Sequence, residues 1–201
     1  MILYDDNEIV VCIKEKGILS QQGKPGQRSM IDILSSMYSC EIYPVHRLDK
    51  EVSGVMVYAK TKSAAANLSL QVSERKIEKH YLATTSVALP EEEGTMEDLL
   101  YFDKGKNKSF VVKKERRGVK KAILEYKLFS SEEDRVTYKV RLLTGRTHQV
   151  RVQFASRKAP LTGDRKYGSQ VNCDIGLVSC FLGFRHPRTG EWLEFQHPNY
   201  N

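Results

Sequence analysis

Short apolar runs separated by turn-forming residues occur along most of the chain, and this pattern predicts β-strands. Two strands are expected on either side of the turn Asp5-Asp6-Asn7, the second running into IVVCIK, and a hairpin is expected at Pro187–Gly190. The remaining expected strands are Val55–Ala59, Ile77–Leu89, Ala122–Phe129, Val136–Leu143 and the two arms of the hairpin within Leu182–Phe195. Strands therefore dominate the predicted structure.

Helical spacing of apolar residues appears in only three places. Ser29–Tyr38 begins with a plausible N-cap serine, Thr61–Arg75 begins with a cap threonine, and Arg146–Arg157 follows Thr144-Gly145. The apolar faces expected for the first two helices consist of Met30, Ile33, Leu34 and Met37, and of Ala64, Ala65, Leu68 and Val72. Residues 17–26 read as a loop, residues 90–94 as an acidic turn and residues 131–134 as a turn between strands. We predict one α+β domain over residues 1–201, a mixed, mostly antiparallel sheet with flanking helices.

Composition agrees with a folded protein rather than a membrane or disulfide-rich one. The chain has 201 residues and is 40% hydrophobic, which suffices for a sizeable core. No apolar stretch is long enough to cross a bilayer, and the acidic first residues do not resemble a signal peptide, so we expect a cytoplasmic protein. We also expect it to be a monomer. The four cysteines form no CxxC pair and lie at no zinc-finger spacing to histidine, so no metal is expected.

Positive charge is concentrated in one segment. Residues 104–121, KGKNKSFVVKKERRGVKK, carry nine lysines and arginines against one glutamate, a net +8 compared with +7 for the whole chain. A solvated loop is the simpler interpretation of such a run. Because the rest of the chain is nearly neutral, a phosphate-binding surface for a nucleic acid or an anionic membrane is favoured, and Lys113, Lys114, Arg116 and Arg117 are its candidate contacts.

Candidate chemistry lies in three stretches, VHRLDKEVSG, KHYLA and TGRTHQVR. Asp49 in the first can act as a nucleophile or base only while it is ionised, and a nearby guanidinium from Arg47 or Arg146 would favour that state. Tyr81 in the second supplies a phenol. No Ser-His-Asp order, phosphate loop or metal cage is present in the sequence.

Each of these residues also has a structural interpretation. Asp49 could be a turn or capping residue, Tyr81 could belong to the core, and Arg146 could begin a helix. His46 and His148 could be hydrogen-bonded scaffolding. The residues alone therefore indicate an aspartate-centred site on a nucleic-acid-binding protein, and no more.

The residue order in five stretches of the sequence carries further information. VHRLDKEVSGVMVYAKT resembles the signature HRLD-x-x-TSG-x-x-x-x-AK of the RluA-type pseudouridine synthases. IVVCIKEKGILS, KHYLA, TGRTHQVRVQFASRKAPLTGDRKYGS and LGFRHPRTGEWLEF are similar to the other motifs of that family, in the same order. The departures are Glu15 for a usual proline, Val52 for threonine, and Gln153 and Val178 for histidines. They lie beside the proposed chemistry.

The resemblance implies the isomerisation of uridine to pseudouridine in RNA, ribosomal or transfer, with no cofactor. By resemblance Asp49 is the essential carboxylate, Arg146 pairs with it, and Tyr81 lies under the uracil ring. Arg47 would occupy the space left by a flipped base, and His46 would help to shape the wall of the pocket. The motifs begin near residue 9, so we expect a catalytic domain without the S4-type RNA-binding domain of some members.

Two other functions remain open from the sequence. The chain could bind or remodel RNA on the same fold without catalysis, which intact Asp49, Tyr81 and Arg146 argue against. It could also be an aspartate-dependent sugar hydrolase, but such enzymes normally use two carboxylates, and no second acid near Asp49 stands out except Glu51. Detection of pseudouridine in treated RNA separates these functions.

Overall fold

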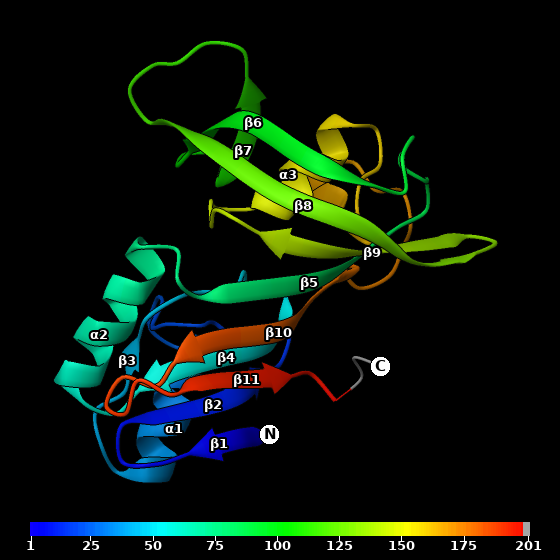
Figure 1. Cartoon of the computed structure of the whole chain (residues 1–201). Coiled ribbons are helices and arrows are strands. Elements are labelled where there is room, and N and C mark those ends of the chain that lie inside the picture. Colours follow the sequence, from blue (N-terminus) through cyan, green and yellow to red (C-terminus); the bar gives the residue numbers. More distant parts are fainter. Residues whose placement is uncertain (199–201) are drawn as a thin grey trace. The chain divides into compact units, whose positions relative to one another are not determined.

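The computed structural model describes residues 1–198 (Figure 1). The chain forms two compact units: Met1–Lys79 together with the segment from Val178 onward, and His80–Leu177. The first unit is therefore built from both ends of the chain, and the second is one continuous segment. The prediction that residues 1–201 form one catalytic domain stays a prediction.

The first unit is a sheet with two helices. Its strands pair in the order β1-β2-β4-β10, with β11 also on β10 and β3 also on β4, and β4 pairs with β10 in parallel. Its elements are β1 (Ile2–Asp5), β2 (Ile9–Lys14), α1 (Met30–Tyr38), β3 (Tyr43–Pro44), β4 (Ser53–Ala59), α2 (Lys62–Ser73), β10 (Leu177–Arg185) and β11 (Trp192–Gln196). The core gathers the apolar residues of β2, β4, α2 and β10, including Val57, Leu68 and Phe184.

Both helices of this unit begin where their sequences predict. Ser29 caps α1 through a capping box with Asp32, and the Thr61 side chain accepts a hydrogen bond from the Ala64 amide at the start of α2. One expectation for α1 is wrong: Met37 lies on the solvent side with 58% of its surface exposed, because the buried stripe is narrower than the apolar spacing suggests.

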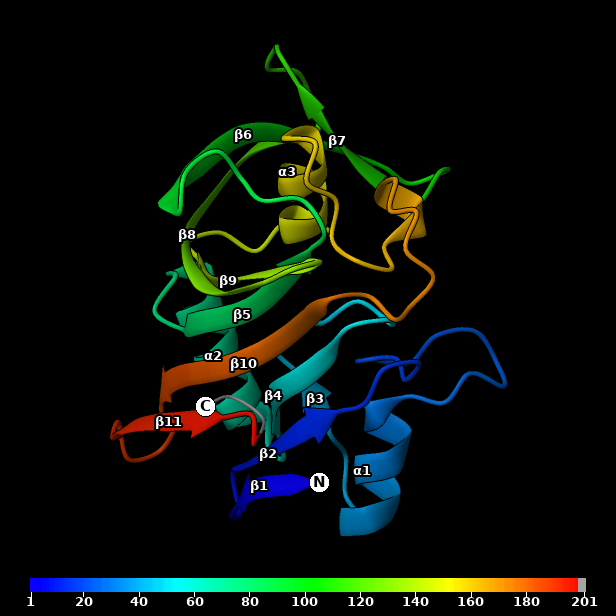
Figure 2. The same ribbon diagram turned by 90° about the vertical axis from the view of Figure 1, so that its right-hand side faces the viewer.

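The second unit is an antiparallel sheet that curves around one helix (Figure 2). Its strands pair in the order β5-β9-β8-β6-β7. Its elements are β5 (Glu78–Thr85), β6 (Glu93–Asp103), β7 (Lys108–Val112), β8 (Val119–Glu132), β9 (Arg135–Leu142), α3 (Gln149–Ser156) and the 3-10 turn η1 (Arg165–Tyr167). Phe154 of α3 packs edge-on against Tyr126 and Tyr138 of the sheet, and these contacts fix the helix on its concave face.

The fold class predicted from the sequence is confirmed, since the pairing is mostly antiparallel and three α-helices accompany the strands within residues 1–198. Several boundaries differ. β5 ends at Thr85 rather than Leu89, and the acidic turn ends before Glu93, where β6 begins. The turn between β8 and β9 shrinks to Glu133 and Asp134.

One further expectation about the second unit needs correction, and the alternative interpretation of its charged segment is also only partly met. The helix expected from Arg146 begins only at Gln149, so Arg146 lies in the preceding turn. The charged segment 104–121 is not one loop, because β7 occupies its middle and β8 begins at Val119. Charged residues can occupy alternate, solvent-facing positions of a strand, which is why a charge run alone does not predict a loop.

Candidate active site

The loop between β3 and β4 carries Asp49, and its backbone is held from the inside of the first unit. The Ser20 hydroxyl donates to the carbonyl of Leu48 at 2.8 Å and accepts the Leu48 amide at 2.9 Å. On the other side of Asp49, the Gly17 amide donates to the Lys50 carbonyl at 2.8 Å. Residues on both sides of Asp49 are thus fixed by hydrogen bonds.

His46 lies near the start of the same loop and acts as a hydrogen-bond acceptor. Its Nε2 accepts the amide of Val57 in β4 at 3.1 Å. Burial lowers the pKa of His46 well below its usual value, and the nearby charge of Lys79 lowers it further. His46 is therefore neutral at physiological pH and ties the start of the loop to the buried strand.

A buried lysine lies behind the loop. Lys14 has no exposed surface, and its ammonium donates to the carbonyls of Glu15, Ile18 and Lys50 at 3.0, 2.8 and 3.2 Å. Burial lowers the pKa of Lys14 to about 8, and the negative charges of Asp49 and Glu51 partly oppose that shift. The ammonium group thus places a positive charge close to Asp49 and anchors the backbone of the next residue.

The side chains at the surface of the loop are Arg47 and Asp49. Arg47 is exposed and Asp49 is partly exposed, whereas Leu48 between them is buried. The Asp49 carbonyl accepts the Val52 amide at 3.1 Å, which closes the turn into β4. The sequence prediction that His46, Arg47 and Asp49 share one loop is therefore met by the structure, with His46 turned inward.

Gly54 allows β4 to pass closely against β10. It has a φ of +132°, and a Cβ atom built there would lie 2.2 Å from the Ser179 carbonyl oxygen. The pairing of Ser53 with Val178 and of Gly54 with Ser179 depends on this close approach. The Ser-Gly that follows the charged loop is thus a packing requirement of the sheet.

The second unit carries Tyr81 and Arg146. Tyr81 lies in β5 opposite Val140 of β9, and 7% of its surface is exposed. Arg146 lies in the turn after β9, where its amide donates to the Gln149 side chain at 3.0 Å and its Nε donates to the Lys121 carbonyl at 2.9 Å. These contacts position the guanidinium at the start of β8.

The segments around Arg146 are joined by buried polar pairs. Arg151 makes a two-pronged ion pair with Asp164, with N–O distances of 2.7 and 2.8 Å, and both side chains are almost fully buried. His148 Nδ1 lies 2.9 Å from the Tyr167 hydroxyl. The motifs TGRTHQVR and GDRKYG, distant in sequence, thus form one hydrogen-bonded unit.

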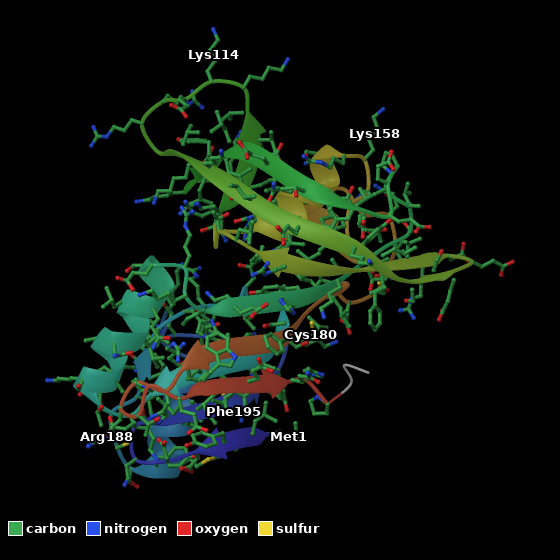
Figure 3. The ribbon with its side chains drawn as sticks, in the orientation of Figure 1. Met1, Lys114, Lys158, Cys180, Arg188 and Phe195 are labelled. Atoms are coloured by element: carbon green, nitrogen blue, oxygen red, sulfur yellow. The ribbon has the colours of Figure 1, made fainter. Side chains whose placement is uncertain are left out.

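The four proposed RNA contacts lie together in the loop between β7 and β8. Lys113, Lys114, Arg116 and Arg117 are all exposed. The loop extends beyond the strands, and Lys114 points away from the ribbon (Figure 3). The Arg116 guanidinium lies 4.8 Å from the centre of the Tyr101 ring, which ties the base of the loop to β6.

Sequence reasoning missed Lys14, Ser20 and Gln149, which hold the candidate site in shape. Their signal was weak, because a single polar residue beside an apolar run resembles a surface position. Among the departures, Gln153 is buried and its amide donates to Asp98 at 2.7 Å, while Val52 is simply core.

Across residues 1–198, no group of three or more potential ligands could hold a metal ion. None of the helices in that range is both long and apolar enough to span a bilayer.

Comparison with known proteins identifies the family. The sequence profile described as RNA pseudouridylate synthase matches residues 8–156. The chain belongs to this family. Its activity is the isomerisation of uridine to pseudouridine in RNA, so the enzyme class predicted from the five motifs is confirmed.

Relatives that match nearly the whole of this chain agree with this family. An uncharacterised RNA pseudouridine synthase of Aquifex aeolicus is 34% identical over 97% of this chain and 68% of its own length. The dual-specificity RNA pseudouridine synthase RluA of Pasteurella multocida is 32% identical over 98% of this chain and 92% of its own. The ribosomal large subunit pseudouridine synthase D of Xylella fastidiosa is 34% identical over 98% of this chain and 62% of its own length.

Solved structures support the fold. Human RNA pseudouridylate synthase domain containing 4 has a TM-score of 0.81 at 24% identity, with 98% of this chain and 87% of that chain covered. Human RNA pseudouridylate synthase domain containing 1 also has a TM-score of 0.81, at 21% identity, with 98% of this chain and 82% of that chain covered.

Proposed function

We propose that this enzyme converts specific uridines of structured ribosomal or transfer RNA, with Asp49 as its essential carboxylate. The observation that carries this assignment is the loop itself. Hydrogen bonds from Ser20, Gly17 and Lys14 fix the backbone on both sides of Asp49, while its side chain keeps access to solvent. A catalytic group held rigidly at a surface is pre-organised for a bound substrate.

The reaction breaks the N1–C1′ glycosidic bond, turns the uracil, and joins its C5 to C1′. The C5 proton is lost and N1 gains one, so the change is an isomerisation with no net oxidation. Asp49 can serve by attacking the ribose, by attacking the base or by removing the C2′ proton, and each role needs an ionised oxygen at the nucleoside. This chemistry calls for no redox cofactor or metal.

The other residues of the site receive roles by their match to the family motifs. Arg146 is the proposed cationic partner of Asp49, and Tyr81 is the proposed surface under the uracil ring. Arg47, exposed two residues before Asp49, would fill the space left by the flipped uridine. His46 would position the loop rather than contact RNA, because its Nε2 is occupied by Val57.

RNA binding in this proposal relies on the basic loop of Lys113, Lys114, Arg116 and Arg117. Ribosomal or transfer RNA would be the partner, a monomer the working form and the cytoplasm the compartment, with no membrane or metal involved. Relatives named for the ribosomal large subunit favour a ribosomal target.

Pseudouridine mapping tests the proposal. Ribosomal and transfer RNA transcripts, which contain no modified bases, are incubated with the enzyme and mapped chemically. We expect one or a few sites of conversion. RNA binding without pseudouridine at any position would contradict the proposal and favour an inactive RNA-binding or remodelling protein.

A further inference from the structure

Two aromatic side chains face outward from the hairpin of β6 and β7. Tyr101 of β6 pairs directly with Phe110 of β7, so their Cβ atoms are about 5 Å apart. The preceding residues, Leu100 and Ser109, are buried, and Leu100 packs with Val152 of α3. Because successive side chains of a strand point to opposite faces, Tyr101 and Phe110 lie on the face turned away from α3, where both are partly exposed.

Three cations lie over these two rings. The Arg116 guanidinium is 4.8 Å from the centre of the Tyr101 ring. The ammonium groups of Lys106 and Lys108 are each 5.8 Å from the centre of the Phe110 ring. Within residues 1–198, none of the three cations forms an ion pair with a carboxylate. Their charges are therefore available to an anion from outside the chain.

The turn that carries the lysines is held in place by backbone carbonyls. The Lys108 ammonium donates to the Lys166 carbonyl at 2.5 Å, and the Lys166 ammonium donates to the Asn107 carbonyl at 3.0 Å. Asp103, at the end of β6, accepts the Lys106 amide at 3.0 Å. Carbonyl oxygens carry only partial negative charge, so they position the two ammonium groups without neutralising them.

The ligand that fits this surface combines a planar ring with an anion. Residues 101–118 carry seven lysines and arginines against Asp103 and Glu115. An unpaired nucleotide can stack its base on an aromatic ring or on a guanidinium plane, while its phosphate meets the cations. A duplex keeps its base faces inside the stack and could use the cations alone. An acidic peptide would likewise leave the rings without a partner.

We propose that the outer face of the β6–β7 hairpin binds an unpaired stretch of the substrate RNA. Its bases would stack on Tyr101 and Phe110, and its phosphates would contact Lys106, Lys108 and Arg116. The identity of the ligand as substrate RNA rests on the function proposed above, whereas affinity for unpaired nucleotides rests on this surface. Since every base has a planar face, such stacking holds RNA without reading its sequence.

The test compares two ten-residue probes by fluorescence anisotropy: the oligouridylate U10 and an abasic oligoribonucleotide with the same phosphates. The wild type should bind U10 at least about fivefold more tightly, the effect of one stacked base. Phe110→Leu keeps an apolar side chain but removes the ring, so it should lose about fivefold or more in U10 affinity and keep its affinity for the abasic strand. Phe110→Tyr keeps the ring and should bind U10 like the wild type.

Two further variants separate stacking from charge. Phe129→Leu is the matched control, because Phe129 is also an exposed phenylalanine of the second unit but is followed by the acidic turn 132–134. Its U10 affinity should equal that of the wild type. Joint substitution of Lys106 and Lys108 by glutamine should lower the slope of log affinity against log salt by about 0.7 per lost contact, for both probes. Thermal unfolding checks that each variant is folded at the temperature of the binding measurement.

Three results would overturn the proposal: equal affinity of the wild type for U10 and the abasic strand, equal losses in Phe110→Leu and Phe129→Leu, or full U10 affinity in Phe110→Leu. The last result would leave the aromatic pair as packing within the hairpin. The comparison of the two probes on the wild type needs no substitution, so it holds even if a variant fails to fold.

None of these measurements involves catalysis. Base-dependent binding by a protein that forms no pseudouridine would retain the stacking surface and defeat the proposed function. Pseudouridine formation without base-dependent binding of U10 would defeat the stacking surface alone.

Discussion

His46 shows how one side chain can link the shape of the loop that carries Asp49 to pH. Its Nε2 accepts the Val57 amide only while the ring is neutral, and burial holds its pKa below the usual 6.5. In the unfolded chain the ring protonates near pH 6.5, so between that value and the folded pKa the unfolded state binds more protons. Stability should therefore fall as pH decreases below about 6.5.

Substitution of His46 by glutamine tests this link. Glutamine keeps an acceptor for the Val57 amide but does not titrate, so His46→Gln should lose less stability than the wild type between pH 7 and pH 5. Chemical denaturation at each pH measures the difference, and the values at pH 7.5 serve as the reference because the ring is neutral in both states. If the plots of unfolding free energy against pH were parallel for the two proteins, His46 would not change its protonation on unfolding.

The close contact of β4 with β10 depends on Gly54. A methyl group there would meet backbone atoms of Ser179 at 2.2 to 2.6 Å, in addition to an unfavourable positive φ. Gly190 is a matched control, because its φ is also positive, at +75°, but nothing lies within 4 Å of its Cβ position. Gly190→Ala should cost about 1 kcal/mol of unfolding free energy, and Gly54→Ala at least about 2 kcal/mol more.

Urea denaturation of both variants gives these free energies. Equal losses of unfolding free energy in Gly54→Ala and Gly190→Ala would mean that β10 moves aside easily. The close approach of β4 and β10 would then not be needed to hold the loop before β4.

The elements best predicted from sequence are those with a local physical signal. Ser29 and Thr61 mark helix starts because a side-chain oxygen must satisfy amides of the first turn, and both caps are present. β6 and β7 were missed because charged and polar residues between their apolar ones hide the strand periodicity. Arg146 was placed in a helix because the turn that holds it depends on Gln149 and Lys121, a contact between distant segments.

The candidate residues themselves were found through motif resemblance, whereas the groups that hold them were not. Lys14 and Ser20 contact the Asp49 loop from positions about 30 residues earlier in the chain. Such contacts depend on the folded path of the backbone, so neither hydrophobic pattern nor charge reveals them.

Charge is divided unequally over the molecule. His80–Leu177 holds 19 lysines and arginines against 13 acids, a net +6, while the rest of the chain holds 13 against 12, a net +1. The unit without Asp49 therefore supplies most of the long-range attraction for RNA. Within it, the loop of Lys113, Lys114, Arg116 and Arg117 is the densest exposed group.

Glutamine at those four positions should weaken RNA binding and flatten its salt dependence. Each lost contact should lower the slope magnitude by about 0.7 for single-stranded RNA or about 0.9 for a duplex. A control variant with glutamine at Lys24, Arg28, Lys62 and Lys76, four exposed basic residues of the other unit, removes the same charge. Equal slopes for the two variants would show that net charge alone matters and that the loop has no special role.

The dependence of catalysis on Asp49 is the central claim, and single-turnover conversion at saturating enzyme tests it most directly. The substrate is the RNA fragment identified by pseudouridine mapping, and Glu51→Gln, an exposed acid two residues away, is the matched control. Asp49→Asn keeps the size of the side chain but removes the ionisable oxygen, so conversion should fall to background while RNA affinity and melting temperature stay at wild-type values. Glu51→Gln should convert at close to the wild-type rate. Conversion by Asp49→Asn above a few per cent of the wild-type rate would contradict the assignment of Asp49 as the essential carboxylate.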